Sequence, residues 1–215
     1  MSFVLHAHPL SSYCWKVLIA LYEKGRPFDF RPVDFGDQAS AAAFRALWPI
    51  GKMPVLEDDG RIIVESSVII EYLDLEDPEA APLVPRDPHA ALEVRRLDRI
   101  FDNYVMAPMQ KIVFDRIRPA DQRNPADVAD GRRLIETSYG WLEQEIGGRP
   151  WAAGASFSLA DCAAAPSLFY AEKVQPTGGR FPALAAYLAR LEARPSFARV
   201  LEEAKPWFRY FPAEA

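Results

Sequence analysis

The sequence predicts an α/β domain followed by an all-α domain. In residues 1–75, short strand-like segments alternate with segments of helical spacing, an order typical of a small sheet with helices on its faces. Residues 76–88 hold four prolines in thirteen positions and show no apolar periodicity, which indicates a domain boundary. Every apolar pattern beyond this stretch has helical spacing. We therefore expect one domain over residues 1–78, a linker over 79–88 and an all-helical domain over 89–215.

The α/β domain is expected to begin with a strand at residues 2–6, and a helix should follow the polar turn His8–Ser12. The helix is predicted from apolar residues at i, i+3, i+4 and i+7 and from a glycine where a helix commonly ends. These residues are Cys14, Val17, Leu18, Leu21 and Gly25. Residues 28–33 can form a second strand, and residues 40–47 form a helical or loop segment.

A hairpin and a further helix complete this domain. Residues 54–57 and 61–64 flank Asp58-Asp59-Gly60, and an Asp-Gly pair supplies the positive φ angles that a tight hairpin turn needs. Helical spacing then returns, at Ser66, Ile69, Ile70 and Leu73.

The second domain should contain a long helix from Ala90 to Ile117, bent at Pro108 because the proline ring clashes with the carbonyl of Tyr104. Further helices are expected to begin at prolines, which are favoured at the first helical position; these are Pro125, Pro182 and Pro195. Another begins at Ser158-Leu159-Ala160-Asp161, which is similar to a capping box with aspartate in place of the usual glutamate.

Composition argues against several classes of function. A formal net charge of -5 without a polybasic run argues against nucleic acid and anionic membrane as partners. No stretch approaches the roughly 18 apolar residues of a membrane span, and two cysteines cannot form a disulfide framework, so we expect a cytoplasmic protein. Three histidines without metal-site spacing predict no metal. The glycine-rich nucleotide motifs and the GxSxG motif of serine hydrolases are absent.

The first strand-to-helix turn is the leading candidate for chemistry, because a helix N-terminus binds anions. The Ser11 or Ser12 hydroxyl could serve such an anion, or it could only cap the helix. Cys14 lies on the apolar stripe of the helix, so we expect a buried side chain instead of a reactive thiol.

Two other polar segments precede secondary-structure elements. In Gly51-Lys52-Met53-Pro54 we expect a cis bond between Met53 and Pro54, or else an ordinary trans proline at the start of an edge strand. In Glu65-Ser66 a strand meets a helix, and helix capping would explain the serine without any ligand.

Together these segments resemble the cytosolic glutathione transferase superfamily. The similarity is carried by the order and spacing of LSSYCWKV from Leu10, GKMPVL from Gly51 and VESS from Val64, and by the Ser158–Asp161 segment. The resemblance implies a thioredoxin-like domain that binds glutathione as co-substrate, an all-helical domain, a homodimer and a role in detoxification.

Carried over residue by residue, the resemblance assigns Ser11 as the hydrogen-bond donor to the glutathione sulfur, with Ser12 as the alternative. The first run is also similar to that of zeta-class isomerases, but Tyr13 stands where those enzymes carry cysteine.

The resemblance also assigns residues to the remainder of glutathione: Lys52, Met53, Pro54, Glu65 and Ser66. The main chain of Met53, before the cis proline, would pair with the cysteinyl part. Glu65 and Ser66 would hold the γ-glutamyl ammonium and carboxylate, and Lys52 would reach the glycine carboxylate.

The leading hypothesis is therefore a glutathione transferase, whose bound thiolate attacks a hydrophobic electrophile. We expect the electrophile pocket between the domains, lined by Tyr13, Tyr104 and Phe114. The aromatic tail 205–212 either covers this pocket or packs on the body of the protein. Two alternatives stay open. The first is another glutathione-dependent enzyme, either an isomerase of the maleylacetoacetate type or a thiol reductase or peroxidase. The second is a non-catalytic binding or scaffold protein.

Overall fold

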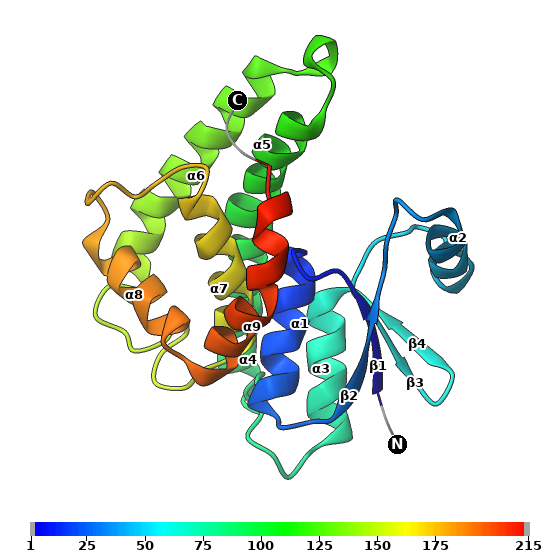
Figure 1. Cartoon of the computed structure of the whole chain (residues 1–215). Helices are drawn as coiled ribbons and strands as arrows, with labels where there is room; N and C mark the ends of the chain where they lie inside the picture. The colour runs from blue at the N-terminus through cyan, green and yellow to red at the C-terminus, as the bar shows by residue number, and fades with distance from the viewer. Residues whose placement is uncertain (1–2, 213–215) are drawn as a thin grey trace.

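The computed structural model describes residues 3–212 (Figure 1). Ser2, which begins the first predicted strand, and residues 213–215 lie outside the described residues. The elements are β1 Phe3–Ala7, α1 Ser12–Glu23, β2 Phe28–Pro32, α2 Gln38–Leu47, β3 Val55–Asp58, β4 Arg61–Val64, α3 Ser66–Glu76, α4 Pro88–Ile100, α5 Ala107–Ile117, α6 Pro125–Glu145, α7 Leu159–Glu172, α8 Pro182–Glu192 and α9 Pro195–Ala204. A π-helical turn, Phe101–Met106, joins α4 to α5, and 3₁₀ turns lie at Ala120–Gln122 and Lys205–Tyr210.

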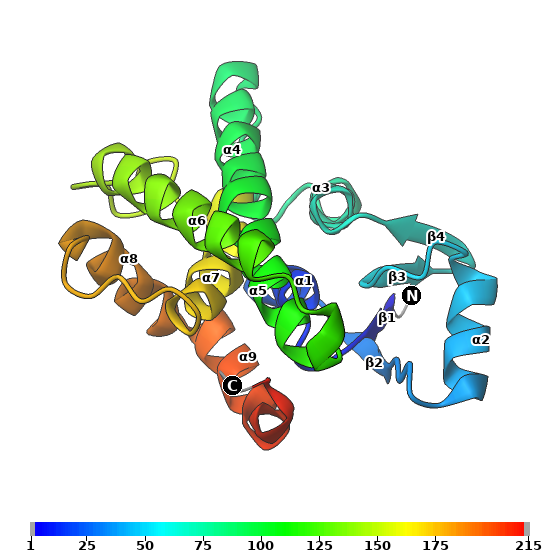
Figure 2. The ribbon, with the colours of Figure 1, turned by 90° about the horizontal axis from the view of Figure 1, so that it is seen from above.

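The first seven elements form a thioredoxin-like domain of order βαβαββα around a four-stranded mixed sheet. The strand order is β2-β1-β3-β4, with β1 parallel to β2 and antiparallel to β3. Helices α1 and α3 cover one face of the sheet and α2 lies on the other (Figure 2). The predicted fold class is therefore confirmed, and the 40–47 segment is a helix.

The hairpin between β3 and β4 has the predicted turn. Asp58 pairs with Arg61, and the two residues between them both have positive φ, 46° at Asp59 and 81° at Gly60. Such angles suit a right-twisted two-residue hairpin, and glycine adopts them without steric cost. The Met53–Pro54 peptide bond that precedes β3 is cis, as predicted.

The second domain is all-helical, but its predicted long helix is interrupted before Pro108. The π-helical turn Phe101–Met106 lies between α4 and α5, and Pro108 falls in the first turn of α5. Proline has no N–H to donate and clashes with the preceding turn, and a widened turn accommodates both effects. No helix within residues 3–212 is long and apolar enough to cross a lipid bilayer.

Helix α1 lies between the sheet and the helical domain. It packs against α3 on one side and against α7 and α9 on the other (Figure 1). The fully buried Trp15 ring meets the rings of Phe169, Tyr170, Phe197 and Phe208. Because both domains cover α1, its buried surface extends around the whole helix instead of along one stripe.

A buried ionic cluster also joins the domains. Lys16 of α1 is fully buried and pairs with Asp98 and Asp102 of the helical domain. Its Nζ also lies 2.9 Å from the Ser67 hydroxyl of α3. Each charge in this cluster has an opposite partner, which is the condition under which charges are tolerated inside a protein.

Candidate functional site

A cavity of about 610 Å³ borders the turn between β1 and α1. This volume lies within the roughly 300–1,000 Å³ typical of small-molecule sites. Its wall comes from this turn, from residues 33–36 and 51–53, from α5 and from the C-terminal tail. The predicted site residues that the structure brings together around it are Ser11, Ser12, Tyr13, Lys52, Met53 and Phe114.

Ser11 is the N-cap of α1, and the residue also lines the cavity. The Oγ atom accepts a hydrogen bond from the Cys14 N–H at 3.4 Å. A serine hydroxyl can accept and donate at once, so this contact leaves the Ser11 proton free for a ligand. Capping and ligand binding, which the sequence left as alternatives, are therefore compatible.

Ser12 is less accessible than Ser11. Its side chain is buried, with 2% of the residue exposed, and its Oγ lies 3.5 Å from Nε2 of Gln110 on α5. The Ser12 hydroxyl thus contacts the helical domain, whereas the Ser11 hydroxyl belongs to the helix cap.

The side chains of Tyr13 and Cys14 are both protonated at neutral pH. Cys14 is fully buried, which confirms the prediction of a buried side chain, and burial raises the pKa of its thiol to about 12. Burial, assisted by the charge of Asp102, raises the pKa of Tyr13 to about 12. Tyr13, which lines the cavity, therefore carries a neutral phenol.

Lys52 and Met53 line the cavity, whereas Pro54 does not. Lys52 is exposed, Met53 is half-buried and Pro54 is buried. This segment, which precedes β3, thus brings the ammonium group of Lys52 and the main chain of Met53 to the cavity wall.

Glu65 and Ser66 begin α3 and are not among the residues that line the cavity. Glu65 has a φ of 69°, which is uncommon for a residue other than glycine, and its side chain makes no capping hydrogen bond. Ser66 is the first helical residue, so the interpretation that its hydroxyl caps the helix is wrong. The first N–H groups of α3 receive no acceptor from the cap residue, an arrangement suited to an external anion.

The structure does not place Tyr104 in the cavity, contrary to the expectation. Tyr104 lies in the π-helical turn and is 50% exposed. It precedes Phe114 by ten residues, and at about 100° per residue two such positions are about 80° apart around a helix. The π-helical turn changes the phase further, so the two aromatic side chains lie on different faces.

The structure also adds cavity residues that the sequence reasoning missed. Gln110, Val113 and Ile117 share the cavity wall with Phe114. Helical spacing from Phe114 would have found Gln110, four residues before it, and Ile117, three residues after it. Tyr170 and the tail residues Tyr210 to Pro212 line it as well. The tail packs on the body of the protein and also borders the cavity, because Phe208 packs on the Trp15 ring while Tyr210 to Pro212 line the cavity.

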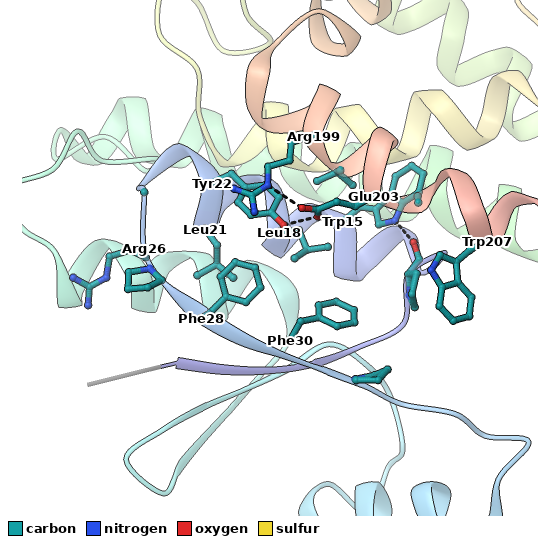
Figure 3. Close-up of a pocket in the computed structure, with 16 residues that line it drawn as sticks. Trp15, Leu18, Leu21, Tyr22, Arg26, Phe28, Phe30, Arg199, Glu203 and Trp207 are labelled. Atoms are coloured by element: carbon teal, nitrogen blue, oxygen red, sulfur yellow. Dashed lines mark hydrogen bonds and ion pairs between the residues drawn. The ribbon is translucent and has the colours of Figure 1, made fainter.

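A second cavity, of about 740 Å³, adjoins the same turn at Pro9 (Figure 3). It lies between α1, β2, α9 and the tail, with Phe28 and Phe30 on the strand side. On the helix side the Tyr22 hydroxyl donates to Glu203 at 2.6 Å. None of the predicted site residues, all of which are described, lines this cavity.

His8 holds the start of the turn through an unprotonated ring nitrogen. Its Nδ1 accepts a hydrogen bond from the Leu10 N–H at 3.1 Å, which a protonated nitrogen cannot do. Burial lowers the pKa of His8 below its usual 6.5, while the charge of Asp34 acts in the opposite direction.

This shift predicts a pH dependence of stability. Because the folded state disfavours protonation, His8 contributes stability that is present above pH 6.5 and lost as the pH falls through the lowered pKa. The free energy of unfolding should therefore fall more steeply between about pH 7 and about pH 5 in the wild type than in His8→Asn, whose Oδ1 can accept the same bond without titrating. Urea unfolding across this range measures the difference, and identical pH profiles would contradict it.

Comparison with known proteins finds relatives for both domains. Two family models match it, glutathione S-transferase N-terminal domain over residues 5–81 and glutathione S-transferase C-terminal domain over residues 125–190. A crystal structure of a glutathione S-transferase from Methylobacterium radiotolerans in complex with glutathione sulfonate is 33% identical, with a TM-score of 0.80 over 93% of this chain and 94% of that chain.

Curated relatives agree with these matches. FtsZ-localized protein A of Caulobacter vibrioides is 31% identical over 94% of this chain and 92% of its own length. Probable maleylacetoacetate isomerase 2 of Drosophila melanogaster is 27% identical over 90% of this chain and 85% of its own length. Since both domains and nearly the full length match, the chain belongs to the cytosolic glutathione transferase superfamily.

Proposed function

We propose that the protein is a glutathione transferase that stabilises the glutathione thiolate and directs it at an electrophilic carbon of a hydrophobic second substrate. The observation that carries this proposal is the Ser11 hydroxyl, which caps α1 and has a free proton on the wall of a mostly apolar cavity. The relative whose structure holds glutathione sulfonate supports the choice of glutathione.

Ser11 and α1 can supply the energy that thiolate formation requires. A free thiol has a pKa near 8.5, and lowering it by about two units requires about 2.7 kcal/mol of selective stabilisation of the anion. One hydrogen bond to a charged group contributes about 1.5–3 kcal/mol, and a helix N-terminus contributes about 0.3–1 kcal/mol. No general base is needed, because the role assigned to Ser11 is to donate a hydrogen bond to the thiolate and not to take up its proton.

The remaining groups of glutathione have complementary partners nearby. We assign the γ-glutamyl carboxylate to the uncapped N–H groups at Ser66 and the γ-glutamyl ammonium to Glu65. The main chain of Met53 would pair with the cysteinyl part, and Lys52 would reach the glycine carboxylate.

The electrophile would occupy the side of the cavity that α5 and the tail enclose. Phe114 and Ile117 provide apolar side chains there, and the neutral Tyr13 phenol can donate a hydrogen bond to a polar substituent. Tyr104 has no part in this pocket.

A second candidate is glutathione-dependent isomerisation, which the similarity to the Drosophila protein favours. Assays with glutathione and a chlorinated nitrobenzene, an unsaturated diketo acid or a peroxide separate the functions. Conjugation of the nitrobenzene would support the proposal. Turnover of the diketo acid alone would indicate an isomerase, turnover of the peroxide alone would indicate a reductase or peroxidase, and glutathione binding without any turnover would indicate a binding or scaffold protein.

Replacing Glu65 with glycine should stabilise the fold and weaken glutathione binding. A positive φ costs a non-glycine residue about 1–3 kcal/mol, and glycine removes this cost at an entropic cost of about 0.5–1 kcal/mol. We expect the free energy of unfolding to rise by about 1 kcal/mol and the Kd for glutathione to rise about tenfold through loss of the carboxylate. Denaturation and calorimetry measure the two effects.

Glu65→Gln is the matched control, because it keeps the strained backbone and loses the charge. It should weaken binding without adding stability. A Glu65→Gly protein that binds glutathione as tightly as the wild type would refute the assigned role of the carboxylate.

A further inference from the structure

The turn that carries Ser11 contains two consecutive peptide groups, and in each of them both the N–H and the carbonyl oxygen form a hydrogen bond. In the Pro9–Leu10 group, the carbonyl oxygen accepts from Trp15 Nε1 at 2.6 Å, and the N–H donates to His8 Nδ1 at 3.1 Å (Figure 3 shows the Trp15 contact as a dashed line). In the Leu10–Ser11 group, the N–H donates to the His8 carbonyl at 3.0 Å, and the Leu10 carbonyl accepts from the Tyr170 hydroxyl at 2.9 Å.

This pattern fixes the direction of the Ser11 side chain. A peptide group is planar, so holding its N–H and its carbonyl from opposite sides sets the orientation of the whole plane. The plane between Leu10 and Ser11 ends at the Ser11 Cα atom, so its orientation helps to set where the Cβ–Oγ bond points. Hydrogen bonds to every polar group of a short segment give the kind of preorganisation that a transition-state donor requires.

Tyr170 differs from the other groups that hold the turn, because it comes from the other domain. His8 and Trp15 belong to the thioredoxin-like domain, whereas Tyr170 is on α7 of the helical domain. Among the described residues, its hydroxyl makes the hydrogen bond by which the helical domain acts on the backbone of residues 9–11.

The Tyr170 side chain is itself immobilised. The residue is 2% exposed, its ring lies 4.7 Å from the Trp15 ring, and it stacks on Phe211 of the tail at 5.6 Å and 22°. Burial raises the pKa of Tyr170 well above its usual 10, so the hydroxyl remains a donor throughout the neutral range. The tail, α7 and the serine turn therefore form one packed unit beside the cavity.

We infer that Tyr170 is a positioning residue for the Ser11 hydroxyl, and this inference rests on the proposed function. Tyr170 also lines the cavity, but its hydroxyl is engaged by the Leu10 carbonyl, so this group acts on Ser11 through the turn. The helical domain thereby contributes to thiolate stabilisation as well as to the electrophile pocket.

The test compares Tyr170→Phe with Tyr187→Phe. Both changes remove one buried phenolic hydroxyl from the helical domain and keep the ring, and the Tyr187 hydroxyl donates to Asp161 at 2.6 Å, away from the turn. In each protein we would measure the ultraviolet thiolate absorbance of bound glutathione against pH, the kcat and KM for conjugation, and the unfolding temperature.

In Tyr170→Phe we expect the thiolate pKa to rise by about 0.5–1 unit, kcat at about pH 5.5, where little of the thiol is ionised, to fall about three- to tenfold, and the KM for glutathione to stay within about twofold. In Tyr187→Phe we expect a lower unfolding temperature with the wild-type thiolate pKa and kcat.

Two results would overturn the inference: a wild-type thiolate pKa in glutathione-bound Tyr170→Phe, or an equal pKa shift in both variants, which would indicate general loosening of the domain. A different result would be that glutathione bound to the wild-type protein ionises at the same pKa as free glutathione. This result would refute the proposed function and the positioning role together.

Discussion

Replacing Ser11 with alanine is expected to raise the thiolate pKa of bound glutathione by about 1–2 units and to lower kcat for conjugation by about 10²–10³. The reason is that the hydroxyl is the donor assigned to the sulfur anion, and loss of one such donor from an oxyanion site has an effect of this size. The fold should tolerate the change, because the cap contact to Cys14 is long, at 3.4 Å. We expect a loss of less than about 1 kcal/mol in the free energy of unfolding.

Ser12→Ala is the matched control for this experiment. Ser12 is adjacent, borders the same cavity and contacts Gln110 instead of capping α1. It should keep the thiolate pKa of the wild type. If Ser11→Ala left the thiolate pKa unchanged and Ser12→Ala alone abolished activity, the role of sulfur donor would move to Ser12.

Replacing Asp161 with alanine is expected to destabilise the helical domain by about 3–5 kcal/mol. The capping-box pattern in the sequence predicts only about 1 kcal/mol, the cost of losing a cap partner. The capping box is present, but the carboxylate does more than complete it. Asp161 is fully buried and accepts from the backbone of Ser158 and Ala152, at 2.9 and 2.8 Å.

Two hydroxyl donors complete the environment of this carboxylate. The Ser158 hydroxyl lies 2.9 Å and the Tyr187 hydroxyl 2.6 Å from its oxygens. Alanine would leave these donors and the Ala152 N–H buried without an acceptor, and each such group costs about 1–3 kcal/mol. The total is a large part of the roughly 5–15 kcal/mol by which proteins are stable.

Denaturant unfolding of Asp161→Ala measures this effect. Asp130→Ala is a suitable control, because Asp130 is exposed on α6 and pairs only with Arg133 among the partners described for it. It should change stability by no more than about 0.5 kcal/mol. An Asp161→Ala protein of normal stability that had lost conjugating activity would show that Asp161 is functional and not structural.

Features with a local cause could be predicted from the sequence. The hairpin follows from Asp59-Gly60, because few residues accept positive φ, and the capping box follows from the spacing of Ser158 and Asp161. Cys14 could be assigned to the core because it lies on the apolar stripe of its helix. In each case the residues that determine the feature lie within one turn or one helix.

Features that depend on contact between the domains could not be predicted in this way. A lysine is usually exposed to solvent, yet Lys16 is fully buried. Its burial is possible because Asp98 and Asp102, more than 80 residues away in the sequence, pair with it. Tyr170 has no local pattern that links it to the Leu10 carbonyl. Tyr104 was misplaced because the π-helical turn changes the phase of the helix between it and Phe114.

The most direct test of the account is the thiolate pKa of glutathione bound to the wild-type protein. Calorimetry would first establish saturation with glutathione, and the ultraviolet thiolate absorbance of the complex would then be followed as the pH is varied. The account predicts binding in the micromolar to low-millimolar range and a thiolate pKa about two units below that of the free thiol. A bound thiol that ionises at the pKa of free glutathione, or no binding at all, would contradict it.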